Sequence, residues 1–205
     1  MKDPAGLMLA TTVNCYWTSV LLLAALRRIR RRQSAGLLPE KANERRMWLM
    51  WVPAVVAWNV LPRVALNNHH MPFGLPDFLR DYTAFQAMRF AAAATACFCF
   101  LLTVHCWMKM GRSWSLAVLR DRDTSLVQTG VFGLVRHPIY SLSIGLMLAS
   151  TVVFPTLPMV FVASVHITAL ILKARSEEGH LLLKHGQAYR EYSRRTGRFL
   201  PRLVS

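Results

Sequence analysis

Long runs without a formal charge are the feature that most restricts how this chain can fold. The first covers residues 5–26 and ends at a block of arginines that begins with Arg27. About 20 apolar residues in a helix suffice to cross the hydrocarbon core of a bilayer. In a cleaved signal peptide the positive charge precedes a shorter apolar run, whereas here the basic block follows it. The sequence therefore predicts a membrane span over residues 5–26.

Three further apolar stretches extend this pattern along the chain. They cover Met47–Leu66, Phe90–Met108 and Ile139–Leu172, and the last is interrupted by Pro155 and Pro158. Composition agrees, because 54% of the residues are hydrophobic and only 17% are charged, which is unusual for a soluble domain. We predict an all-α integral membrane protein with about five transmembrane helices, of which the last two form a C-terminal helical hairpin with a cytosolic helical extension.

The ends of these spans carry more specific expectations. Each arm of the hairpin is short for a membrane crossing, so the second helix is expected to continue through residues 173–185 and to stop at Gly186. Pro138 suits the first turn of the first arm. Arg89 precedes the third span, and its long side chain is expected to snorkel towards an interface.

The basic residues predict an orientation. If the N-terminus lies outside, the loops 27–46 and 109–136 and the tail from Lys173 place eight, five and eight of the 25 Lys and Arg residues on the cytoplasmic side. Cytoplasmic loops are enriched in these residues. We therefore expect an external N-terminus, a cytoplasmic C-terminus and a location in a bacterial inner membrane.

The same charges limit the expected partners. Basic loops beside spans attract anionic membrane lipids, and the chain has no recognisable nucleic-acid module, so we expect lipid contact and no nucleic acid. The four cysteines lie inside predicted spans without the spacing of a zinc site, and we expect no bound metal.

Ionisable residues gather where the hairpin meets the membrane surface. The motif Arg136-His137-Pro138-Ile139-Tyr140 opens the first arm, and Arg175, Glu177 and Glu178 follow the second. At 1.5 Å per residue, Tyr140 lies about 22 Å and Glu177 about 28 Å from the hairpin turn, so they differ by roughly one helical turn in height. A purely structural alternative is that the carboxylates pair with Arg175 and Lys184 while Arg136 binds lipid phosphate.

The order of these motifs resembles the isoprenylcysteine carboxyl methyltransferase family and is similar to membrane phospholipid N-methyltransferases. Arg-His-Pro-x-Tyr is followed by Glu-Glu, by Leu182-Leu183-Lys184-His185-Gly186-Gln187-Ala188-Tyr189-Arg190-Glu191-Tyr192 and by Phe199-Leu200-Pro201. The resemblance covers roughly residues 111–201. We treat residues 1–205 as a single membrane domain, with spans one to three in 1–110 and a methyltransferase-like region with spans four and five in 111–205.

The resemblance implies a small bundle of membrane helices that uses S-adenosylmethionine as methyl donor in a cytosol-facing pocket. Carried over by position, the implied cofactor-binding residues are Gly130, His137, Tyr140 and Glu178. The implied catalytic or acceptor-side residues are Arg136, Arg175 and Glu177. The chain departs from the family pattern at Val131 and Phe132, where Pro and Tyr are usual, at Leu142, where Gly is usual, and at His185, where Phe is usual.

These residue types suit methyl transfer to a lipophilic acceptor that enters from the bilayer. The face of Tyr140 could stabilise a sulfonium cation, and Glu178 could bind the donor's amino group or ribose hydroxyls. An isoprenylcysteine-type carboxylate needs no base and would be held by Arg175 or Arg136, whereas an amine would need His137 or Glu177 as base.

Two other functions fit the same sequence. Sterol-reductase C-terminal regions share a similar His-Pro-x-Tyr run, so an NADPH-dependent membrane reductase is one alternative. A non-catalytic membrane adaptor is the other, and the departures at Val131 and Leu142 favour it.

Overall fold

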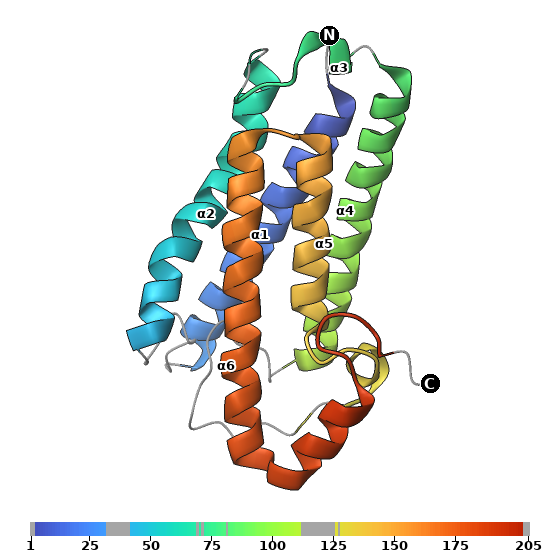
Figure 1. Ribbon diagram of the computed structural model, residues 1–205. Coiled ribbons are helices and arrows are strands. Elements are labelled where there is room, and N and C mark those ends of the chain that lie inside the picture. Colours follow the sequence, from blue (N-terminus) through green and yellow to red (C-terminus); the bar gives the residue numbers. More distant parts are fainter. Residues whose placement is uncertain are drawn as a thin grey trace.

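The computed structural model consists of helices that run side by side in a bundle (Figure 1). It describes residues 3–31, 42–68, 70, 72–80, 82–111, 126 and 128–202. In chain order the elements are α1 (Pro4–Arg31), α2 (Ala42–Asn67), α3 (Asp77–Arg80), α4 (Thr83–Met110), the 3-10 helix η2 (Gly130–Gly133), α5 (Pro138–Val153) and α6 (Leu157–Arg195). Much of the two predicted basic loops, at 32–41 and 112–125, lies outside the described residues.

Four of the helices are long and apolar enough to cross a membrane, and these are α1, α2, α4 and α6. The remaining predicted span, the fourth in chain order, is the shorter apolar helix α5, with 16 residues. It rises only about 24 Å, against a hydrocarbon thickness of roughly 30 Å. Accordingly, the turn between α5 and α6 stands below the neighbouring ends of α2 and α4 (Figure 1). The prediction of an all-α integral membrane protein is confirmed.

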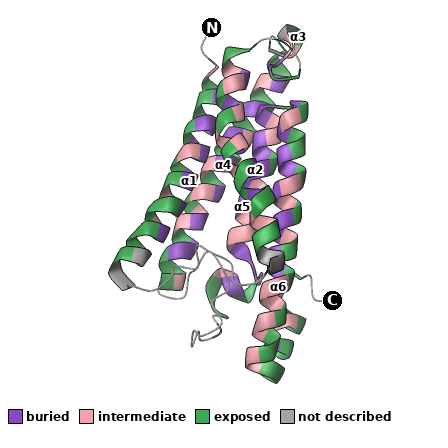
Figure 2. Cartoon of the chain, turned by 90° about the vertical axis from the view of Figure 1, so that its left-hand side faces the viewer, coloured by how far each residue is buried: buried purple, intermediate pink, exposed green. Residues whose placement is uncertain are grey.

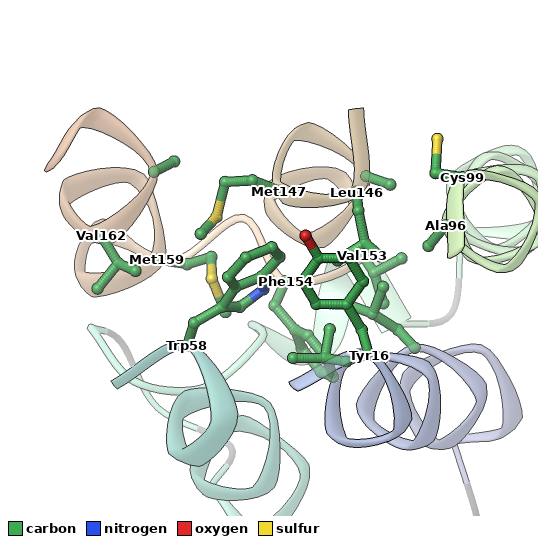
Figure 3. Close-up of a cluster of buried hydrophobic side chains, with 14 of the residues drawn as sticks. Tyr16, Trp58, Ala96, Cys99, Leu146, Met147, Val153, Phe154, Met159 and Val162 are labelled. Atoms are coloured by element: carbon green, nitrogen blue, oxygen red, sulfur yellow. The ribbon is translucent and has the colours of Figure 1, made fainter. Parts of the chain in front are cut away.

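Apolar packing holds the bundle together. Helix α4 packs along α5, α2 packs along α6, and α1 contacts α2, α4 and α5. Trp58, Phe154 and Met159 are fully buried, and Figure 3 shows them meeting between the helices with Tyr16 and Met147. Buried positions face the interior, whereas exposed positions cover the outside (Figure 2). Large apolar side chains remain on the outside, as a lipid-facing surface requires; examples are Leu21, Leu49 and Phe161.

A few buried polar side chains join the helices inside this apolar core. The indole of Trp51 on α2 donates to His166 Nδ1 on α6 over 3.1 Å, and His166 Nε2 lies 3.0 Å from the Ser143 hydroxyl on α5. Trp58 donates to the Ser150 hydroxyl on α5 over 2.9 Å. Each bond satisfies a polar group that would otherwise face hydrocarbon. Together they fix the hairpin against α2.

Arg89 does not snorkel to an interface, and that prediction is wrong. Its side chain is buried, with the residue only 1% exposed, and it forms an ion pair with Asp3. The guanidinium also donates to the Val153 carbonyl at the end of α5 over 2.9 Å. Because α5 stops short of the other helix ends, this carbonyl lies inside the bundle and needs an internal donor. Arg89 supplies it.

Regular helix is interrupted at Gly186, where the stop was predicted, and a second helical segment follows the kink. The glycine has φ 51° and ψ −119°, and helical residues continue on its far side to Arg195. About 20 residues of α6, as far as Ser176, suffice to cross the hydrocarbon core. The remainder extends beyond the bundle, bends at Gly186 and returns towards the start of α5 (Figure 1). This bent extension and the start of α5 form what we call the motif end of the bundle.

Candidate active site

Backbone hydrogen bonds join the Arg-His-Pro segment to the tail that follows α6. Val135 and Gly197 form an isolated parallel bridge. The amide of Arg136 donates to the Gly197 carbonyl over 2.8 Å, and the amide of His137 donates to the Arg198 carbonyl over 3.1 Å. Pro138 then begins α5, as predicted, at a position that needs no amide donor. The two ends of the predicted motif region therefore meet in space.

Glu178 is the centre of an ion cluster with Arg136 and Arg198. Arg136 Nε lies 3.0 Å from Oε1 of Glu178, and Arg198 binds both carboxylate oxygens, at 3.0 Å from Nε to Oε1 and 2.6 Å from Nη2 to Oε2. Arg136 also donates to the carbonyls of Ser193 and Thr196. The same guanidinium thus ties the start of α5 to the bent extension.

These contacts determine the ionisation of Glu178, which lies beyond the part of α6 needed to cross the bilayer. Burial alone would raise the pKa of the carboxyl, but hydrogen bonds from His137, Arg198 and Arg136 hold this pKa well below its ordinary value. The carboxylate is therefore charged at physiological pH, and three protein side chains already bind it. A carboxylate engaged in this way is better suited to holding the site together than to binding a ligand.

His137 connects this cluster to the second carboxylate. Its Nε2 lies 3.3 Å from Oε1 of Glu178, and its Nδ1 lies 3.6 Å from Oε2 of Glu177. The residue is buried, with 8% of its surface exposed. One imidazole therefore links two adjacent acids.

Tyr140 pairs with Glu177. The hydroxyl of Tyr140 donates to Glu177 Oε1 over 2.5 Å. Its ring stacks on His137, with centroids 5.2 Å apart and planes 4° from parallel. The ammonium of Lys173 lies 5.4 Å from the same ring. Because two protein groups already contact this ring, its hydroxyl and Glu177 are better placed for ligand contact than its face.

The other predicted residues lie at the edges of this arrangement. Arg175 is exposed and makes no ion pair with any residue that the structure describes, so its role as an acceptor clamp stays a prediction. Gly130 has φ 64°, a conformation that favours glycine, and starts η2 at the exposed rim. The structure pairs Glu178 with Arg136 and Arg198, which differs from the purely structural alternative for this glutamate.

Sequence reasoning missed three residues in or beside the motif end: Lys173, Arg198 and Tyr189. Lys173 is buried although it stands where the apolar run of α6 ends, and that position is a signal that the sequence does contain. Arg198 reaches Glu178 only because of the bridge between Val135 and Gly197, which no local pattern predicts. Tyr189 belongs to the tail motif, but its burial depends on the bend at Gly186.

Two tyrosines of the bent extension pack beside the ion cluster. Tyr192 donates to the Phe132 carbonyl of η2 over 2.6 Å, and its ring lies 6.0 Å from that of Tyr189. Phe132 is buried as well. The departure at Phe132 therefore keeps an aromatic side chain in the packed interior of the motif end.

A comparison with known protein families matches the part of the chain that contains this site. Residues 91–185 match the isoprenylcysteine carboxyl methyltransferase (ICMT) family. This match confirms the resemblance that the motifs predicted. It begins within α4 and ends one residue before the bend, so it contains Arg136, His137, Tyr140 and both glutamates.

The ICMT family is one of membrane methyltransferases, and the described helices agree with a multi-pass membrane protein. The tail from Gly186 onward lies outside the matched residues, yet in this structure it supplies Arg198 to Glu178. No curated protein and no solved structure matches the chain.

Proposed function

We propose that this protein transfers a methyl group from S-adenosylmethionine to a lipophilic acceptor at the motif end, with an isoprenylcysteine-type carboxylate as the candidate acceptor. The observation that carries the proposal is the cluster of His137, Tyr140, Glu177 and Glu178, which lies within the ICMT match and beside an apolar bundle.

The polar groups of the motif end fit such a donor. Within the described part of the chain, two buried polar atoms there lack a hydrogen-bond partner, namely His185 Nε2 and the Tyr189 hydroxyl. Glu177 offers a partly exposed carboxylate, with 22% of its side chain accessible, while Arg198 offers a guanidinium that is 35% accessible. A zwitterionic amino-acid group needs both signs of charge, and both are present within one cluster.

S-adenosylmethionine, when bound, supplies an electrophilic methyl group on a positively charged sulfur. We assign Glu177 to the donor's ammonium, because its carboxylate is more exposed than that of Glu178 and has fewer protein partners. Tyr140 and His137 hold Glu177 in position through the contacts described above. Glu178, with Arg136 and Arg198, fixes the relative position of α5 and the bent extension.

A carboxylate acceptor and an amine acceptor would need different chemistry from these residues. A carboxylate acceptor is already an anion, so the residues need only position it and exclude water. An amine acceptor must lose a proton, and His137 or Glu177 would receive it. The buried Lys173, at the membrane boundary of α6, favours an anionic acceptor because a cation there attracts a carboxylate.

We further propose that the motif end faces the cytosol of a bacterium. The predicted distribution of Lys and Arg supports this orientation, as does the need for a soluble donor. Reporter fusions to each terminus, with an alkaline phosphatase that is active only outside, test it. Activity at the N-terminal fusion and none at the C-terminal fusion is the expected result.

Purified protein in lipid nanodiscs tests the reaction. We expect radiolabel from methyl-labelled S-adenosylmethionine to appear in the organic extract when an N-acetylated S-prenyl cysteine is present. Glu177→Gln should abolish most of this transfer, and Arg194→Ala, an exposed change beyond the cluster, is the control. Label confined to water-soluble products would contradict a lipophilic acceptor.

Cofactor titration separates this function from its two alternatives. A methyltransferase binds S-adenosylhomocysteine saturably and NADPH weakly or not at all. Saturable NADPH binding alone would indicate the reductase. Binding of neither cofactor, by protein that is folded, would indicate the adaptor.

A further inference from the structure

Two tyrosines of the bent extension, Tyr189 and Tyr192, differ in the hydrogen bonding of their hydroxyls. Tyr189 and Tyr192 are each 4% exposed and contact each other edge to face. The hydroxyl of Tyr192 donates to the Phe132 carbonyl over 2.6 Å. The hydroxyl of Tyr189 is buried and finds no hydrogen-bond partner among the residues that the structure describes. Leaving a buried hydroxyl without a partner is unfavourable, and such cases in native proteins call for an explanation.

Charges of both signs surround Tyr189. The guanidinium groups of Arg136 and Arg198 and the carboxylate of Glu178 all act on it electrostatically. Burial, followed by the nearby charge of Glu178, raises the pKa of Tyr189 above its ordinary value. The phenol therefore stays neutral and can donate its proton in a hydrogen bond. An anionic oxygen is the strongest acceptor for such a donor, and the two guanidinium groups favour an anion at this position.

We propose that the Tyr189 hydroxyl, beside Arg136 and Arg198, binds a substrate carboxylate. The inference rests on the proposed function and deepens it by naming the group recognised. Two substrates could bring that carboxylate: the methyl donor, through its amino-acid end, and a carboxylate acceptor. Tyr189 is a binding residue in this account, because no step of the transfer needs its proton.

Two ligands, each measured on two protein variants, test whether the methyl donor supplies the carboxylate. Binding of S-adenosylhomocysteine and of its decarboxylated analogue is measured by calorimetry in nanodiscs, for the wild-type protein and for Tyr189→Phe. If the donor supplies the carboxylate, Tyr189→Phe weakens S-adenosylhomocysteine about tenfold or more and leaves the analogue unchanged, because a hydrogen bond to a charged group is lost only in the first case.

A second arm tests the acceptor. If the acceptor supplies the carboxylate, Tyr189→Phe leaves both donor affinities unchanged and raises the KM for a prenylcysteine carboxylate about tenfold, with kcat nearly unchanged. Unchanged donor affinities together with an unchanged acceptor KM would overturn the inference. Failure of the wild-type protein to bind S-adenosylhomocysteine at all would instead overturn the proposed function.

Tyr192→Phe is the matched control, because it removes a hydroxyl of equal burial that is already satisfied. We expect Tyr192→Phe to lower the Tm of the ligand-free protein, since the Phe132 carbonyl loses its donor. Tyr189→Phe should leave that Tm unchanged or raise it, because it removes an unsatisfied group. A lower Tm for Tyr189→Phe, equal to that of the control, would show that the hydroxyl has a structural partner and would contradict the proposal.

Discussion

An arginine holds each end of the short helix α5, but the two arrangements differ. At the hairpin turn, Arg89 binds Asp3 and the Val153 carbonyl, between the rings of Phe85 and Phe154. At the motif end, Arg136 belongs to a cluster with two carboxylates, a second arginine and a histidine.

The polar groups described around Arg89 pair with one another, whereas the motif end includes polar groups without a described partner. Around Arg89, the guanidinium pairs with Asp3, the Val153 carbonyl and the Gln86 side chain. The motif end includes a partly exposed carboxylate and two buried polar atoms that find no hydrogen-bond partner among the described residues. Ionisable groups beside a membrane are costly unless they are paired or used. The difference supports the proposal that the Arg89 pair serves the fold and that the motif end binds a ligand.

Removing Arg89 should have the largest effect on stability and none on the site. Arg89→Ala leaves Asp3 and the end of α5 without their partner, and we expect a loss of about 3–5 kcal/mol, as for other buried pairs. Thermal unfolding in detergent measures it. Arg63→Ala, which removes an exposed side chain with one bond to Asn14, should change stability little. Weaker donor binding by the folded Arg89→Ala protein would break the comparison.

Glu178→Gln should have the second-largest effect on stability. The change removes the negative charge that holds Arg136 and Arg198, so we expect a loss of about 2–3 kcal/mol together with loosening of the bent extension. Proteolysis near the bend at Gly186 should become faster, which mass spectrometry of the fragments can detect. Wild-type cleavage rates would show that Glu178 does not hold this segment.

Glu177→Gln should affect ligand binding more than folding. Its carboxylate is more exposed than that of Glu178, and it contacts Tyr140 and His137. We expect a stability loss below about 1 kcal/mol and donor affinity reduced about tenfold. Calorimetry with S-adenosylhomocysteine tests it. If Glu178→Gln weakened binding more than Glu177→Gln at equal folded fraction, the assignment of the two acids would be reversed.

The smallest expected effect is the change with pH in the stability difference between the wild-type protein and Glu178→Gln. The pKa of Glu178 lies below its ordinary value in the folded state, so its contribution to stability is complete above that ordinary value and declines as the pH falls below it. The stability difference between wild-type protein and Glu178→Gln should therefore be constant from pH 7 to 5 and shrink towards pH 3. A difference that shrinks already between pH 7 and 6 would contradict the charge state assigned to Glu178.

The helices and their order could be predicted from the sequence because charge-free runs and proline breaks are local signals. The ICMT resemblance could be predicted as well, since Arg136, Tyr140 and the glutamate pair stand at a characteristic spacing. The side-chain partners of Glu177 and Glu178 could not be predicted from the sequence. Neighbouring residues in a helix point about 100° apart, so the rotation of α6 decides that Tyr140 contacts Glu177 and Arg136 contacts Glu178.

Long-range contacts explain the remaining differences. Hydropathy places Arg89 near a helix end but does not show whether it points outward or towards Asp3. The bend at Gly186 and the bridge between Val135 and Gly197 bring Arg198 and Tyr189 to the site from the far end of the chain. Neither residue stands near the Arg-His-Pro motif in sequence.

Hydrogen exchange measured with and without S-adenosylhomocysteine, on the wild-type protein in nanodiscs, tests the central claim most directly. The account predicts slower exchange at the motif end, in residues 134–142 and 176–198, and unchanged exchange around Arg89 and the hairpin turn at residues 153–156. Protection at the hairpin turn, or no protection at either end while the ligand is bound, would contradict it.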